Sequence, residues 1–260
     1  MEQKVLGNNV VDINGIKIGG DNPLVFIAGP CTIESKDKAN EIVKAVKISG
    51  ANIFRGGSFK LRTSPYSFQG LGYAALDILE DLDMPTVSEI TSIEQIPYFE
   101  KCVDIIQVGA RNMHNYELLK ALGKTNKPII LKRGFDSTIE EWLYAAEYIL
   151  LGGNKNVILC ERGVRTFTNE TRFTLDLGGV TYVKKVSRLP VIVDPSHAAG
   201  KSSLVKPLAL AAIAAGADGL IIEVDTNPEK AISDGEQAIT PDVLKEIIEE
   251  GNRIREIIRK

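Results

Sequence analysis

Eight short apolar runs, many of them rich in β-branched residues, recur along most of the 260-residue chain. Such near-continuous apolarity is typical of parallel strands that are buried on both faces of a sheet. The runs occupy residues 24–28, 52–55, 86–90, 105–109, 129–132, 157–160, 191–194 and 220–224. Helical apolar patterns separate them, so the sequence predicts a regular alternation of strand and helix.

The helical patterns are clearest around residues 40–47, 76–82 and 142–150. A last helix is expected to begin at Pro241, with Thr240 as its N-cap. Eight strands, each followed by a helix or crossover, predict an α/β fold, the (β/α)8 TIM barrel. A doubly wound open sheet is the alternative, although no GxGxxG follows the first run, which weakens a dinucleotide-binding version.

The first twenty residues predict a short N-terminal β-hairpin. Asn14-Gly15 suits a type I′ turn, in which both turn positions need positive φ, and apolar residues flank it on both sides. We expect this hairpin to cover one end of the main fold. The chain length is close to the about 250 residues of one barrel, so residues 1–260 are predicted to form a single catalytic domain, with 1–20 as the hairpin extension.

Composition argues against several classes of protein. A net charge of −3 gives no global attraction to nucleic acid or anionic membrane. The longest apolar run, near 208–215, is far shorter than the ~20 residues of a membrane span, and the N-terminus lacks a signal-like apolar core. Three cysteines do not suggest a disulfide framework. The sequence therefore predicts a cytoplasmic protein with reduced thiols.

Basic residues gather where the predicted strands end. In a barrel, these ends meet at one face, which carries the functional residues. Any one of these cations alone could be a solvated surface charge, but six beside glycine and hydroxyl residues favour a pocket for phosphorylated anions. The six are Arg55, Lys60, Arg62, Arg111, Lys132 and Arg162.

A second set of residues at the strand ends can bind a divalent metal ion. It consists of Cys31, His197, Glu223 and Asp234. Thiolate, imidazole and carboxylates together suit Mn, Fe, Co or Zn rather than Mg or Ca. Cys31 alone is more often a core cysteine, but Glu223 lies within an apolar run, where an unpaired carboxylate is costly. Cys102 and Cys160 are expected in the core, and His114 either lines the pocket or lies on the surface.

Several long motifs occur in an order that resembles one known family over essentially the whole chain. They are GPCTIES, FRGGSFKLRTSPYSFQGLG, QVGARNM, ILKRG, LCERGVRTF, VIVDPSHAAGK and GLIIEV. The chain is similar to 3-deoxy-D-arabino-heptulosonate 7-phosphate (DAHP) synthases of the short type I beta branch. The resemblance implies a (β/α)8 barrel that condenses phosphoenolpyruvate with erythrose 4-phosphate and water, releasing phosphate, as the first step of the shikimate pathway.

The resemblance also implies roles for individual residues. Metal ligands would be Cys31, His197, Glu223 and Asp234. Phosphoenolpyruvate would contact Arg55, Lys60, Ala110, Arg111, Lys132 and Arg162. The phosphate of the aldose would contact Arg62, Thr63 and Ser64. Lys60 is the candidate for proton transfer to the aldehyde oxygen, so Lys60, Cys31 and His197 are the predicted catalytic residues.

Three other functions stay open. One is 3-deoxy-D-manno-octulosonate 8-phosphate synthase, which uses arabinose 5-phosphate, although the two-residue step from Lys60 to Arg62 favours the four-carbon aldose. The second is a non-catalytic barrel that binds sugar phosphates, and the third is a class II-type metal aldolase. Leu61 replaces a proline that the family usually has, and so it is expected to loosen this loop.

The resemblance further implies a homodimer or homotetramer, and no nucleic-acid or membrane partner. About twenty residues precede the first predicted barrel strand, too few for the regulatory or chorismate mutase domain that some relatives carry. The expectation is therefore that aromatic amino acids do not inhibit the chain.

Overall fold

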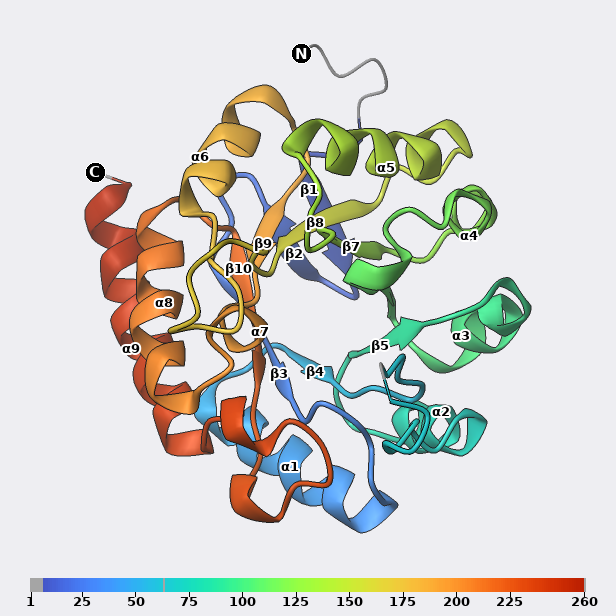
Figure 1. Ribbon diagram of the computed structural model, residues 1–260, viewed down its shortest axis with the longest axis vertical. Helices are drawn as coiled ribbons and strands as arrows, with labels where there is room; N and C mark the ends of the chain where they lie inside the picture. Colours follow the sequence, from blue (N-terminus) through green and yellow to red (C-terminus); the bar gives the residue numbers. More distant parts are fainter. Residues whose placement is uncertain (1–6, 63, 260) are drawn as a thin grey trace.

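The computed structural model describes residues 7–62 and 64–259, in which eight parallel strands close into a barrel inside a ring of helices (Figure 1). The order around the barrel is β3, β4, β5, β6, β7, β8, β9 and β10, and β10 pairs with β3 to close the ring. The predicted TIM barrel with its N-terminal hairpin is confirmed. Closure of the ring excludes the open doubly wound sheet.

The barrel strands coincide with the eight apolar runs to within one residue at each end. They are β3 (Val25–Gly29), β4 (Ile53–Arg55), β5 (Thr86–Ile90), β6 (Ile105–Val108), β7 (Ile129–Lys132), β8 (Val157–Glu161), β9 (Val191–Val193) and β10 (Gly219–Glu223). The agreement is close because nearly every strand residue is buried, so the apolar pattern is interrupted only where a strand ends.

The helices follow the strands in the order that the apolar patterns predict. They are α1 (Lys36–Ser49), α2 (Tyr73–Glu80), α3 (Ile96–Cys102), α4 (Tyr116–Leu122), α5 (Ile139–Leu151), α6 (Leu177–Val186), α7 (Pro195–Ala199), α8 (Ser202–Ala214) and α9 (Pro241–Ile258). Short 3-10 turns are η1 (Ile93–Gln95), η2 (Ala110–Asn112), η3 (Pro228–Lys230) and η4 (Gly235–Gln237).

Local signals explain several helix boundaries. In α1, the side chain of Ser35 accepts a hydrogen bond from the backbone N–H of Lys38, and Gly50 ends the helix with φ of 100°. Helix α9 begins at Pro241 as predicted, but the side chain of Thr240 makes no capping hydrogen bond. Thr240 therefore occupies the N-cap position without the predicted side-chain contact.

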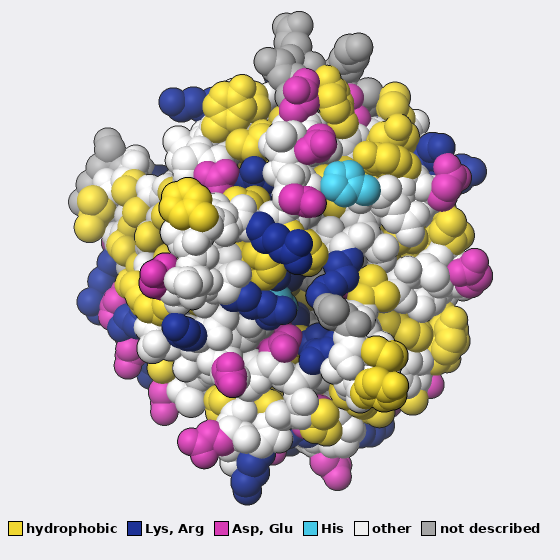
Figure 2. Space-filling model, viewed as in Figure 1, with side chains coloured by type: hydrophobic (Ala, Val, Ile, Leu, Met, Phe, Trp, Pro, Cys, Tyr) yellow, Lys and Arg dark blue, Asp and Glu magenta, His cyan; other side chains and the backbone are white. Residues whose placement is uncertain are grey.

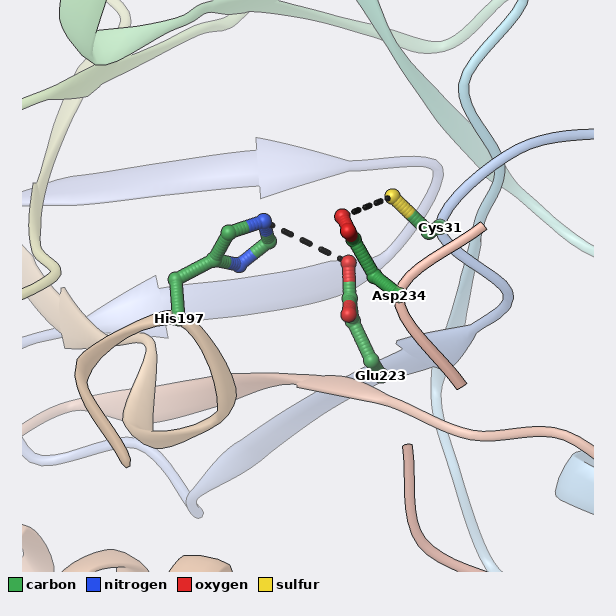
Figure 3. Close-up of side chains that lie close together, drawn as sticks. All are labelled: Cys31, His197, Glu223 and Asp234. Carbon is green, nitrogen blue, oxygen red and sulfur yellow. Dashed lines mark hydrogen bonds and ion pairs between the residues drawn. The ribbon is translucent and has the colours of Figure 1, made fainter. Parts of the chain in front are cut away.

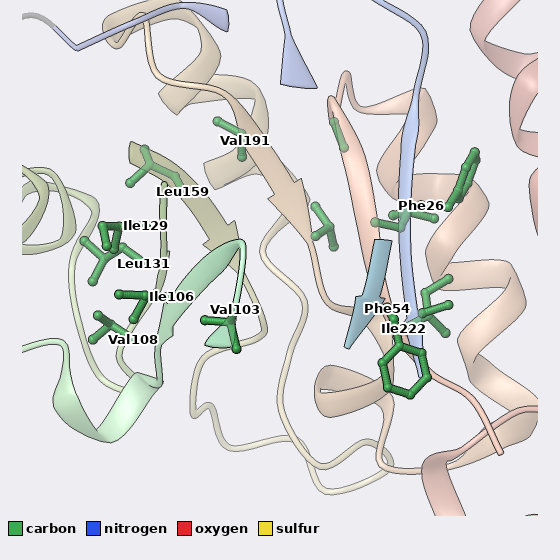
Figure 4. Packing of buried hydrophobic residues seen from close by; sticks show 14 of the residues in the cluster. Phe26, Phe54, Val103, Ile106, Val108, Ile129, Leu131, Leu159, Val191 and Ile222 are labelled. Atoms are coloured by element: carbon green, nitrogen blue, oxygen red, sulfur yellow. The ribbon is translucent and has the colours of Figure 1, made fainter. Parts of the chain in front are cut away.

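Side chains alternate between the two sides of the barrel wall. Ile129 and Leu131 of β7 point outward to the helices, whereas Ile130 between them points into the barrel. Figure 4 shows the outward layer, which includes Phe26 and Ile106. This period of two places a second apolar cluster inside the barrel, separate from the layer beneath the helices.

The hairpin of β1 (Val10–Ile13) and β2 (Ile16–Gly19) covers the amino end of the barrel. Asn14 and Gly15 form its turn with φ of 52° and 92°, as the predicted type I′ turn requires. Val11, Ile13 and Ile18 are buried against the interior apolar cluster. The amino end is therefore closed by packing.

None of the described helices is long and apolar enough to cross a lipid bilayer.

Candidate active site

The carboxyl ends of the barrel strands surround a cavity of about 270 Å³, called here the carboxyl-end cavity. Figure 2 shows Lys and Arg side chains gathered around the hollow at this end. Its lining includes seven of the predicted substrate-binding residues: Arg55, Lys60, Arg62, Ser64, Arg111, Lys132 and Arg162. Residues distant in sequence thus meet at one opening because parallel strands all end on the same face.

The four predicted metal ligands point toward one another at one side of this cavity (Figure 3). One ligand atom from each lies within 4.8 Å of the others. Cys31 follows β3, His197 lies in α7, Glu223 ends β10, and Asp234 precedes η4 with φ of 54°. Aspartate tolerates this left-handed conformation better than most residues, so the loop can turn its carboxylate into the cluster.

A buried carboxylate fixes the orientation of the His197 ring. Nδ1 of His197 donates to Oδ2 of Asp194 at 2.7 Å, which leaves Nε2 facing Glu223 Oε1 at 3.3 Å. Burial lowers the pKa of His197 to about 4, against the opposing effect of Asp194. The imidazole is therefore neutral near pH 7, and its Nε2 lone pair is available to a metal ion.

Glu223 carries an oxygen that has no hydrogen-bond partner among the described residues. Its Oε2 accepts from Nε2 of Gln237 at 2.6 Å, whereas the buried Oε1 accepts no hydrogen bond. Burial opposes ionisation, but the pKa of Glu223 is lowered, with Arg55 contributing through its Nη2, which lies 3.3 Å from Oε1. A buried, ionised oxygen without a donor fits a bound cation, because such an atom is otherwise costly.

Cys31, Lys60 and Asp234 form the other side of the cluster. Sγ of Cys31 lies 3.1 Å from Oδ2 of Asp234, and the ammonium of Lys60 contacts both residues. Burial opposes the charge on Asp234, yet Lys60 lowers the pKa of this carboxyl well below its usual range. Burial, and then Glu223, raises the pKa of Cys31, so a metal ion binding here would displace the thiol proton.

The donors of the cluster therefore fit a divalent cation. One thiol, one imidazole and two carboxylates favour Mn, Fe, Co or Zn over Mg or Ca. A second group, Asp77, Glu80 and Cys102, also has ligand atoms close together, but its carboxylates are exposed. Glu80 there contacts Lys101, and Asp77 accepts from Tyr98, so ordinary surface interactions account for that group.

Two buried guanidinium groups in the carboxyl-end cavity lack a full set of partners. Nη1 of Arg55 and Nη1 of Arg162 make no hydrogen bond in the described part of the chain. Arg162 stacks on Phe173, with its guanidinium carbon 4.2 Å from the ring centroid, and burial lowers its pKa to about 10. Both guanidinium groups are still cationic at neutral pH, so they can bind an anion.

The remaining cations lie around these two. Lys132, at the end of β7, is 3% exposed and contacts Asp194. Arg111 is more exposed, with its guanidinium 5.3 Å from the ring centroid of Phe135. Ala110 begins η2 next to Arg111 and is not among the residues that line the cavity. Its predicted contact with substrate stays a prediction.

The loop after Lys60 forms one rim of the cavity. Nη1 of Arg62 lies 3.8 Å from Oδ1 of Asp234, and Leu61 and Ser64 also line the space. The backbone N–H of Lys60 donates to the carbonyl of Gln69, which ties the two ends of the loop together. Thr63, the third predicted contact for the aldose phosphate, lies outside the described residues.

Several residues at the cavity were not among the predicted site residues. Glu89 and Gln107 lie on neighbouring strands and are joined by a 2.9 Å hydrogen bond. Both stand at strand ends, so the rule that located the cations could also have found them. Arg172 lies eleven residues beyond the end of β8 and reaches the cavity because its loop folds back onto α7. No strand-end signal marks it.

The two cysteines predicted to lie in the core do so. Cys102, the last residue of α3, is buried and contacts Glu80, and Cys160 lies within the interior apolar cluster. His114 is exposed and packs edge-on against Tyr116, outside the cavity. Its surface role, one of the two alternatives, is the one that the structure favours.

Known proteins resemble this chain in both sequence and structure. The model of the DAHP synthetase I family matches residues 5–260. Phospho-2-dehydro-3-deoxyheptonate aldolase of Thermotoga maritima is 45% identical over 96% of this chain and 75% of its own length. A 2-dehydro-3-deoxyphosphooctonate aldolase of Geobacter sulfurreducens is 32% identical over 96% of this chain and 98% of its own.

Solved structures agree with the sequence comparison. The crystal structure of the Thermotoga maritima phospho-2-dehydro-3-deoxyheptonate aldolase (DAHP synthase) superposes with a TM-score of 0.93 at 43% identity, covering 99% of this chain and 78% of that one. A truncated form of the synthase from the same organism gives 0.89 at 41% identity, covering 97% and 94%. The predicted resemblance and enzyme class are confirmed: this chain belongs to the DAHP synthetase I family.

Proposed function

We propose that this chain condenses phosphoenolpyruvate with erythrose 4-phosphate and water, giving 3-deoxy-D-arabino-heptulosonate 7-phosphate and inorganic phosphate. The observation that carries the proposal is that buried groups of opposite charge with unfilled hydrogen-bonding positions lie together at one end of the barrel. Among the described residues, Nη1 of Arg55, Nη1 of Arg162 and the buried Oε1 of Glu223 make no hydrogen bond, although Oε1 lies 3.3 Å from Nη2 of Arg55. A reaction that brings an anionic substrate beside a divalent cation uses both.

Arg55, Arg111, Lys132 and Arg162 are proposed to bind phosphoenolpyruvate. Arginine pairs bidentately with carboxylate or phosphate, and Lys132 adds a point charge. Arg62, with Thr63 and Ser64, is proposed to hold the aldose phosphate at the rim. Two anions held by separate cations bring carbon 3 of phosphoenolpyruvate to the aldehyde carbon, which is an orientation effect.

A divalent cation held by Cys31, His197, Glu223 and Asp234 would act as a Lewis acid on the aldehyde oxygen. Lys60 is proposed to supply the proton to that oxygen as the new carbon–carbon bond forms. Burial opposes its charge, but Cys31 and Glu223 raise the pKa of Lys60, so the ammonium has a proton to give at neutral pH. Water adds at carbon 2, and phosphate leaves with cleavage of its bond to carbon 2.

Phosphate release is the direct test. Purified protein, loaded in turn with Mn²⁺, Fe²⁺, Co²⁺ or Zn²⁺, is assayed with phosphoenolpyruvate plus either erythrose 4-phosphate or arabinose 5-phosphate. We expect release with erythrose 4-phosphate and its loss after chelation. Preference for arabinose 5-phosphate would instead assign the octulosonate reaction, and no release with any metal would assign a non-catalytic binding protein.

The position of the phosphate oxygen tests the chemistry. Phosphoenolpyruvate with oxygen-18 in the bridging position should deliver the label to inorganic phosphate, since the bond to carbon 2 breaks. Retention of the label in the sugar product would contradict this step.

The domain organisation and assembly are part of the same proposal. We expect one catalytic unit with the hairpin as its extension, in the cytoplasm, as a homodimer or homotetramer. Light scattering coupled to size-exclusion chromatography measures the assembly, and a monomeric mass would contradict it.

A further inference from the structure

Asp194 lies between the metal ligands and the cations of the carboxyl-end cavity, and it contacts both. It follows β9, is 0% exposed, and caps α7. Its Oδ2 accepts from Nδ1 of His197 at 2.7 Å and from Nζ of Lys132 at 2.5 Å, while its Oδ1 accepts from the backbone N–H of His197 at 2.9 Å. One oxygen therefore serves a metal ligand and a substrate-binding cation at once.

We infer that Asp194 is a positioning residue that raises the affinity of the site for the metal cation and lowers its affinity for the anionic substrate. This inference rests on the metal ligands and the phosphoenolpyruvate-binding residues proposed above. Toward the metal site, the carboxylate orients the His197 ring and makes Nε2 a better ligand, as outer carboxylates do for metal-bound histidines. Toward the substrate, the same charge neutralises part of Lys132 and so weakens its attraction for an anion.

The shared oxygen makes the two effects inseparable. All three groups that reach Asp194 are donors, and an ionised carboxylate accepts from every one of them. An asparagine at this position offers one acceptor oxygen and one amide that can only donate. Whichever way the amide faces, at least one donor loses its acceptor, and the negative charge is lost on both sides.

The substitutions Asp194→Asn and Asp194→Ser test the inference. Asparagine and serine are both good N-caps, so α7 retains its capping residue. Isothermal titration calorimetry on metal-free protein measures Mn²⁺ affinity and, separately, phosphoenolpyruvate affinity. We expect Mn²⁺ affinity to fall about 10–100-fold and phosphoenolpyruvate affinity to rise at least about threefold.

Asp218 supplies a matched control. It is a buried carboxylate that accepts from Lys184 at 2.7 Å and from the backbone N–H of Val191 at 2.8 Å, but it lies at the amino end of the strands. Asp218→Asn should change stability and leave both affinities within twofold of wild type. This control separates a general loss of packing from the effect at the cavity.

The opposite signs make the result decisive. A merely structural role for Asp194 would lower both affinities together, and that outcome would overturn the inference. Unchanged Mn²⁺ affinity or unchanged phosphoenolpyruvate affinity in both Asp194 variants would overturn it as well. Failure of the proposed function would look different, since the wild-type protein itself would then bind neither ligand or release no phosphate.

Discussion

The two ends of this barrel differ in the side chains that line them: apolar at the amino end, and charged at the carboxyl end. At the amino end, Val11, Ile13 and Ile18 of the hairpin close the barrel with apolar packing. At the carboxyl end, buried Arg55 and Glu223 each keep an atom without a hydrogen-bond partner among the described residues. Buried polar groups without a hydrogen-bond partner cost stability. The difference therefore indicates that the amino end stabilises the fold, whereas the carboxyl end keeps destabilising polar groups because they bind ligands.

The comparison extends to two buried carboxylates at opposite ends of the strands. Asp218 accepts from Lys184 and from backbone, and its contacts hold strands together. Asp194 accepts from Lys132 and His197, both of which line the cavity. The same type of ion pair therefore serves structure at one end and ligand binding at the other.

The largest expected effect comes from Cys31. Cys31→Ala removes one of four ligands, and we expect bound divalent metal and phosphate release to fall together by at least about 100-fold. Metal content by mass spectrometry and the steady-state assay measure the two losses. Cys102→Ala, a buried cysteine outside the cavity, should retain both, and retention of metal by Cys31→Ala would refute the ligand assignment.

Two arginines sharpen the contrast between paired and unpaired charge. Arg133 pairs with buried Glu161 at 2.9 Å and with Asp176 at 2.8 Å, so Arg133→Met should cost about 3–5 kcal/mol of unfolding free energy. Nη1 of Arg162 makes no hydrogen bond within residues 7–62 and 64–259, so Arg162→Met should leave stability unchanged or raise it, while phosphoenolpyruvate affinity falls at least about tenfold.

Urea unfolding and calorimetric binding distinguish the two variants. Equal destabilisation by both substitutions would contradict the claim that the guanidinium of Arg162 is kept for a ligand.

The hairpin should matter for stability alone. Ile18 is 0% exposed in the interior apolar cluster, so Ile18→Ala should lower the free energy of unfolding by about 2–5 kcal/mol. At temperatures where the variant is folded, its kcat and KM should match wild type. The neighbouring exposed Lys17 provides the control, since Lys17→Ala should alter neither the unfolding free energy nor the kinetic constants. A changed KM in Ile18→Ala would contradict the claim that the amino end serves stability alone.

The pH dependence of stability tests the His197 environment. Because the folded-state pKa of His197 is lowered to about 4 from 6.5, the unfolded chain binds more protons between these values. Metal-free wild type should therefore lose stability, relative to His197→Gln, as the pH falls from 6.5 to 4, by up to about 3 kcal/mol. Unfolding of both proteins at several pH values measures this, and a constant difference would contradict a buried neutral imidazole.

Much of the fold could be predicted because burial and periodicity coincide here. Most residues of the barrel strands are apolar and buried, so β7 matches its predicted run at both ends, and the Asn14-Gly15 turn has its expected positive φ. The apolar pattern predicted a helix as far as Leu82, but α2 ends at Glu80. The pattern extends too far because a partly buried leucine just beyond a helix looks the same in the sequence as one inside it.

The candidate site was predictable only where chemistry coincides with strand ends. The four metal ligands and the six cations were predicted on this condition, and the motif resemblance added Thr63 and Ser64. Arg172 could not be found, because a long loop returns it to the cavity from a distant position. The position of Asp194 after β9 was visible in the sequence, but its contact with both Lys132 and His197 depends on packing between strands.

The most direct test of the central claim, that cation and anion sites adjoin at one end of the barrel, is anomalous diffraction from crystals containing Mn²⁺ and phosphoenolpyruvate. We predict one strong peak among Cys31, His197, Glu223 and Asp234, with substrate density against Arg55 and Arg162. A manganese peak elsewhere, or substrate density away from both arginines, would contradict the account.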